Sequence, residues 1–132
     1  MIKQVFNVES YWRVIVYYNV DYTLFNIIED ELIRIGTKSI TINRVYNKMK
    51  YGDGKAVTIS VPQLHIRIVL FNTHYDIYDY TDSIVHEAEH IKQAMLYTYK
   101  VNDEGEPPAY TIGFLVRKMF VVFKKLVCSQ CQ

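Results

Sequence analysis

The 132-residue sequence contains few of the residues that interrupt or cross-link a chain: two Cys, three Pro and five Gly. No linker, repeat or low-complexity segment divides it, which favours one domain over residues 1–132. The two cysteines, Cys128 and Cys131, form a C-x-x-C near the end of the sequence. A C-x-x-C can be half a zinc site or a redox pair, but there is no second one here. We therefore expect residues 128–132 to be an inert, reduced tail.

The sequence also lacks a charge excess and a long apolar run. Its formal net charge is +1, and no basic run or Gly-rich phosphate loop is present. These absences argue against nucleic acid and against an anionic membrane surface as partners. The first residues lack the apolar stretch of a signal peptide, and no run approaches the roughly 20 residues that span a membrane. We expect synthesis in the cytosol and no transmembrane segment.

Hydrophobic residues make up 50% of the chain, and 12 residues are Tyr, so a real core is expected. The patterns predict an α+β fold, in which a small antiparallel sheet packs with three helices. Residues 1–60 are predicted to form a β-α-β part, and residues 64–127 a sheet edge followed by two helices. The predicted strands cover residues 11–20, 39–46, 56–61 and 64–71. The predicted helices cover residues 22–35 and 81–99, and a third begins at residue 106.

One of these helices carries the pattern H-E-x-x-H, formed by His86, Glu87 and His90. Two His at i and i+4 lie on one helical face, so both imidazoles can bind one metal ion, here zinc. Glu87 can then act as general base toward a water molecule. His86 and His90 lie beside the apolar stripe of the helix, so we expect them to be partly buried. The alternative is an exposed helix face with two ordinary histidines.

A catalytic zinc usually has three protein ligands, and the motif supplies two. Glu106, at the predicted start of the next helix, is the best candidate for the third. Tyr110 follows one helical turn later, and its hydroxyl could stabilise an oxyanion, or simply pack. Glu106 could instead be a helix-capping carboxylate. The competing ligands are Asp103, Glu104, His65 and His74.

The segment His86–His90 followed by Glu-Pro-Pro-Ala-Tyr-Thr-Ile-Gly-Phe from Glu106 resembles small H-E-x-x-H proteins of tailed bacteriophages. It is also similar to a minimal gluzincin-type metallopeptidase core. The resemblance covers about residues 64–123. It implies a zincin-like fold with His86, His90 and Glu106 as zinc ligands and Glu87 as general base.

Two functions are predicted from the motif and the resemblance. The first is a zinc-dependent metallopeptidase of bacteriophage origin that acts on a peptide or protein substrate. The second is a non-catalytic virion component, such as a head–tail connector or neck protein, that contacts other virion proteins or forms a homo-oligomer. The abundant aromatic residues suit such contacts. A regulator that cleaves a repressor, or a toxin–antitoxin component, is a weaker third. The host cytoplasm or the virion is the expected location.

Overall fold

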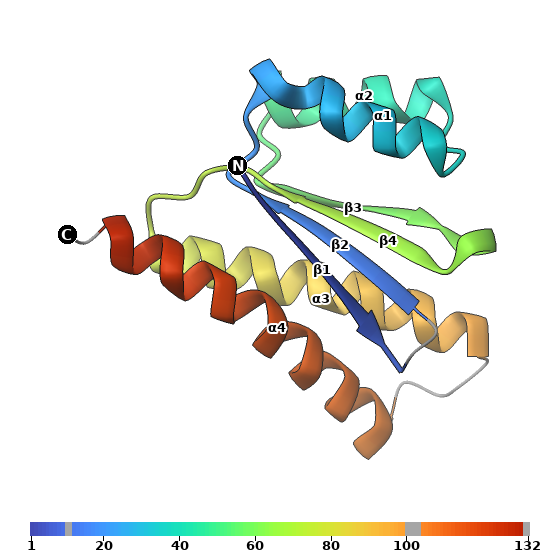
Figure 1. The fold of residues 1–132 in the computed structure, drawn as a ribbon. Helices are drawn as coiled ribbons and strands as arrows, with labels where there is room; N and C mark the ends of the chain where they lie inside the picture. The colour runs from blue at the N-terminus through green and yellow to red at the C-terminus, as the bar shows by residue number, and fades with distance from the viewer. Residues whose placement is uncertain (10–11, 100–103, 131–132) are drawn as a thin grey trace. The chain divides into compact units, whose positions relative to one another are not determined.

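The computed structural model describes residues 1–9, 12–99 and 104–130 (Figure 1). Contacts between residues divide the chain into two compact units, Met1–Thr73 and His74–Gln132. The first unit holds a four-stranded sheet and two α-helices, and the second holds two long α-helices. The expected α+β fold class is thereby confirmed. That residues 1–132 form one domain stays a prediction.

The sheet of the N-terminal unit has the strand order β1-β2-β4-β3. Strands β1 (Ile2–Val8) and β2 (Trp12–Tyr18) form an antiparallel pair, as do β3 (Ala56–Val61) and β4 (Ile66–Phe71). The two pairs join through β2 and β4, which are parallel. The sheet is therefore mixed and not purely antiparallel as predicted. Strand β4 lies inside the sheet and not at its edge, so β1 and β3 form the two edges.

Helices α1 (Phe25–Arg34) and α2 (Ser39–Tyr51) lie over one face of this sheet (Figure 1). Their apolar positions repeat every three or four residues, so each helix turns one stripe toward the strands. The core of the unit combines these stripes with alternate residues of β2, β3 and β4: Ile15, Tyr17, Val20, Phe25, Ile28, Leu32, Ile42, Val45, Met49, Ile59, Ile68 and Leu70.

Local chemistry fixes the ends of the first helical segment. A short 3₁₀ turn, η1 (Tyr22–Leu24), precedes α1, and the Asp21 carboxylate accepts hydrogen bonds from the backbone N–H and the hydroxyl of Thr23. These hydrogen bonds lower the pKa of Asp21. At the other end, Gly36 has a φ of 92°, a conformation that costs glycine little. The helix predicted over residues 22–35 and its Gly36 terminus are both confirmed.

The strand predicted over residues 39–46 is wrong, because this segment is the first part of α2. Ile40 and Ile42 suggested alternation, but Ile40 is exposed, whereas Ile42, Val45 and Met49 are buried at helical spacing. Strand β1 was not predicted. It is an edge strand with only two buried residues, Phe6 and Val8, so its apolar pattern is weak.

The C-terminal unit is an antiparallel hairpin of α3 (Ile77–Tyr99) and α4 (Glu106–Gln130) (Figure 1). The Tyr80 and Phe123 rings pack across it with centroids 4.2 Å apart. Helix α3 begins about four residues before the predicted start because Asp76 serves as its cap: the Asp76 carboxylate accepts a 2.7 Å hydrogen bond from the Tyr78 N–H. The described part of the chain thus has four α-helices instead of the predicted three. None of them combines the length and apolar character that crossing a membrane requires.

Candidate metal centre

His86 and His90 are brought together on one exposed face of α3. Their Nε2 atoms lie 3.1 Å apart, and their ring centroids 4.7 Å apart. Two nitrogen ligands of a tetrahedral zinc, each about 2.0–2.1 Å from the metal, are separated by roughly 3.3 Å. The imidazole pair therefore already has a spacing close to the one that zinc imposes. The donor types and their separation fit two ligands of a zinc ion.

Glu87 differs from the two histidines in its surroundings. It is only 4% exposed, while both imidazoles are exposed, so the expected partial burial of His86 and His90 is wrong. The sequence holds the reason: Glu87 lies three residues after Ile84 and four before Ile91, both of which are fully buried. This spacing places Glu87 on the apolar stripe of the helix and turns the His pair away from it.

The neighbours of the pair on α3 do not supply a third ligand. The Glu89 carboxylate forms a 2.9 Å ion pair with the Lys92 ammonium group. It also accepts a 3.2 Å hydrogen bond from the Gln93 side-chain amide. Across the residues that the structure describes, no group of three or more His, Cys, Asp or Glu side chains is arranged to hold a metal ion. The histidine pair is thus the part of the predicted zinc site that the structure assembles.

Glu106 is the first residue of α4, and its side chain lies outside the described part of the structure. Helix α3 continues from His90 to Tyr99, which is about 14 Å of helix axis. The antiparallel hairpin therefore puts the Glu106 backbone at the connected end of the two helices, well beyond the level of His90. Tyr110, one turn further along α4, is 73% exposed. Neither residue is brought to the His pair by the helical backbone.

The competing ligands have other environments. His74 is buried, its Nε2 lies 2.9 Å from the Ser83 hydroxyl, and its ring packs on Tyr80. The His65 ring stacks on Trp12, with centroids 4.7 Å apart. Both imidazoles thus have packing roles.

The remaining candidates lie near the connection or at the end of the sequence. Glu104 is exposed just before α4, and Asp103 lies outside the described residues. Residues 128–132 were predicted to be a tail after the last helix. In the structure α4 extends to Gln130, so the backbone of Cys128 is helical. The Cys128 side chain and all of Cys131 lie outside the described part.

Comparison with known proteins gives this chain no relative. No family model matches the sequence, and no curated protein or solved structure shows significant similarity to it.

Proposed function

We propose that the protein is a zinc-dependent, metallopeptidase-like protein, with His86 and His90 as zinc ligands and Glu87 as general base. The observation that supports this proposal best is the 3.1 Å separation of the two Nε2 atoms on an exposed helix face. A metal ion can approach this face without any displacement of the core. The proposal includes a phage origin and a location in the host cytoplasm or the virion.

Each residue of the motif has a distinct task in this proposal. His86 and His90 hold the metal through neutral imidazole nitrogens, one helical turn apart. When bound, zinc supplies Lewis-acid activation of a substrate carbonyl and of a water molecule. Glu87 accepts a proton from the attacking water and returns it to the leaving amine. To do so, its carboxylate must turn from the apolar stripe of α3 toward the face that carries the His pair.

Glu106 remains our proposed third ligand, and Tyr110 our proposed oxyanion donor. For Glu106 to reach the metal, the start of α4 must come closer to the His pair than the helical hairpin places it. Zinc binding would then be coupled to a change in this end of the C-terminal unit. Because this approach is required only if Glu106 is a ligand, substitution of Glu106 tests the proposed third ligand directly.

Zinc content by elemental analysis, combined with calorimetric titration, tests the ligands. Wild type is expected to bind one zinc per chain, and H86A and H90A to lose it. E106Q should weaken binding at least tenfold, whereas E104Q, a matched change at an exposed neighbour, should leave it unchanged. E87Q should keep zinc but lose hydrolysis of a quenched fluorescent peptide library.

Two results would contradict the one-chain site. Wild type that takes up no zinc when supplied with it would exclude the proposal altogether. Half a zinc per chain, together with zinc-dependent dimerisation, would mean that His pairs from two copies complete one site. If E106Q and E104Q bind zinc equally well, Glu106 is not a ligand.

A second candidate function, a non-catalytic virion component, is favoured by exposed aromatic side chains in the C-terminal unit. Tyr75, Tyr78 and Tyr97 are 91%, 81% and 87% exposed. Tyrosines are enriched in protein interfaces, where they supply contact area at low entropic cost. Light scattering after size-exclusion chromatography tests this function. A stable ring-like oligomer that H86A does not disturb would favour assembly, and a monomer would count against it.

A further inference from the structure

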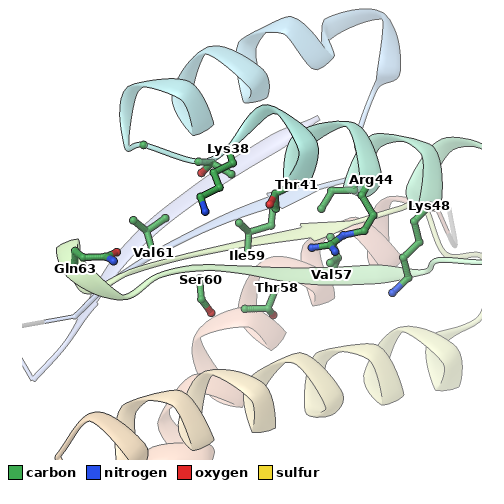
Figure 2. A pocket seen from close by; sticks show the side chains of 13 residues that line it. Lys38, Thr41, Arg44, Lys48, Val57, Thr58, Ile59, Ser60, Val61 and Gln63 are labelled. Carbon is green, nitrogen blue, oxygen red and sulfur yellow. The ribbon is translucent and has the colours of Figure 1, made fainter.

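A groove of about 710 Å³ lies between α2 and the edge strand β3, within the N-terminal unit (Figure 2). Helix α2 and the residue before it supply Lys38, Thr41, Arg44 and Lys48 to its lining. The other wall is β3 itself, along residues 57–61. The groove is separate in sequence and chemistry from the His pair, and its lining residues include none of the proposed zinc ligands.

All charged side chains among the described lining residues of the groove are positive. Figure 2 shows Lys38, Arg44 and Lys48 extending from the α2 side toward β3. Among the described lining residues none is Asp or Glu, and the same part of the structure gives these three cations no side-chain ion pair. Three cations along one helix therefore face a strand edge with no neutralising carboxylate, which favours an anionic occupant.

The strand that forms the other wall lies at the edge of the sheet. β3 is the last strand in the sheet order, and no described strand pairs with its outer side. Its sequence, Ala-Val-Thr-Ile-Ser-Val, contains none of the Lys or Pro residues that protect exposed edges. An extended peptide can add to such an edge through backbone hydrogen bonds. The occupant that fits the edge is thus a polypeptide strand.

The two walls match in length. From Lys38 to Lys48 the helix rises by about 15 Å. In an extended strand, side chains on one face repeat about every 6.6 Å, so three alternate residues span roughly 13 Å. We propose that this groove binds an extended acidic segment of a partner protein, with carboxylates at alternate positions. The segment adds to β3 as a fifth strand, and its carboxylates pair with Lys38, Arg44 and Lys48.

Two other occupants fit less well. Proteins that bind single-stranded nucleic acid usually stack its bases on aromatic rings, and none of the described residues that line the groove is aromatic. A second copy that paired β3 with β3 would bring two rows of cations together, which is unfavourable. Single-stranded DNA serves as a competitor in the test.

Fluorescence anisotropy with a labelled peptide, Val-Glu-Thr-Glu-Val-Glu-Thr, tests the proposal. The full chain should bind this probe at least tenfold more tightly than the same peptide with Gln for Glu. Raising the salt concentration should weaken binding. The triple variant K38Q/R44Q/K48Q should lose at least tenfold in affinity. R117Q/K124Q/K125Q, which removes the same charge from exposed positions on α4, should retain it.

N-methylation of the peptide tests the strand addition without altering the protein. Methyl groups on one set of alternate amides should abolish binding, while methyl groups on the other set should not. Equal binding of the Gln peptide, equal loss in both triple variants, or tolerance of both N-methylated peptides would overturn the proposal. So would single-stranded DNA that competes as well as the unlabelled peptide.

Discussion

The guanidinium carbon of Arg67, on β4, lies 4.4 Å from the centre of the Trp12 ring, on β2. Arg67 is 2% exposed, and burial lowers the pKa of its guanidinium group. One of its N–H groups donates to the Ile66 carbonyl oxygen, but its Nε is buried without a hydrogen-bond partner among the described residues. A buried cation with so few partners is costly.

We therefore expect Arg67→Met to leave the free energy of unfolding unchanged or to raise it by about 1–2 kcal/mol. Met keeps an unbranched apolar side chain at this position and removes the desolvated charge that lies over the Trp12 ring. Arg67→Ala also removes the apolar stem of the side chain, and should be less stable than Arg67→Met. Urea unfolding of the three proteins measures these differences. A Met variant that loses several kcal/mol would show that the charge has a partner outside the described residues.

The Tyr17 hydroxyl donates a hydrogen bond to the Glu31 carboxylate. Burial, and then this hydrogen bond, raise the pKa of Tyr17. A raised pKa means that the contribution to stability is present below about pH 10, the ordinary tyrosine value, and is lost as pH rises above it. Tyr17→Phe should therefore cost about 1–2 kcal/mol at pH 8.

At pH 11 the difference in free energy of unfolding between wild type and Tyr17→Phe should be smaller by about 1 kcal/mol. Only wild type has the Tyr17 hydroxyl, so only wild type loses its stabilising contribution. Urea unfolding at the two pH values measures it. Tyr75→Phe, at a position that is 91% exposed, is the control and should follow wild type throughout. If the difference in free energy of unfolding between wild type and Tyr17→Phe is the same at both pH values, ionisation of the Tyr17 hydroxyl does not cause the loss of stability at high pH.

Zinc should stabilise the folded chain through the His pair. A ligand that binds only the native state stabilises it by about 2.7 kcal/mol at 100 times its Kd. The Tm of wild type should therefore rise by several degrees when zinc is added, and that of H86A/H90A should not. The double variant D82A/Q93A changes two other exposed positions on α3 and should respond like wild type. Thermal unfolding with and without a chelator measures the effect.

Tyr110 should have no part in holding the metal. We assign its hydroxyl to the oxyanion and not to the metal, and its side chain is 73% exposed on the first turns of α4. Tyr110→Phe should bind zinc with wild-type affinity in a calorimetric titration. A loss of zinc affinity would show that the Tyr110 hydroxyl itself helps to hold the metal, contrary to its proposed role as oxyanion donor.

The sequence predicts the structure best where a single element decides the pattern. Helix α3, strand β3 and the Gly36 terminus of α1 all follow from spacing and turn chemistry within a few residues. The helical conformation of α2 was not predicted, because Ile40 and Ile42 are spaced like residues on one face of a strand. The helical spacing becomes visible only when Val45 and Met49 are considered together with Ile42. Because of that error, the sequence did not show that Arg44 and Lys48 lie on one helix.

Local sequence patterns did not predict contacts between segments that are distant in the sequence. Nothing in β2 or β4 alone indicates that they pair in parallel, since register and direction depend on both strands. The candidate site shows the same limit. The spacing of His86 and His90 predicts that they meet, because one helix sets their geometry. The position of Glu106 depends on where α3 ends, and α3 continues past His90 as far as Tyr99.

The parallel pairing of β2 with β4 also has a consequence for how the protein is made. Arg13 pairs with Ile66, so β2 leaves the ribosome about 50 residues before its inner neighbour. At about 5–20 residues per second, this interval lasts roughly 3–10 seconds. During it the apolar strand Trp12–Tyr18 has one open edge, a feature that promotes association between nascent chains. The yield of native protein should therefore depend on how quickly translation reaches β4.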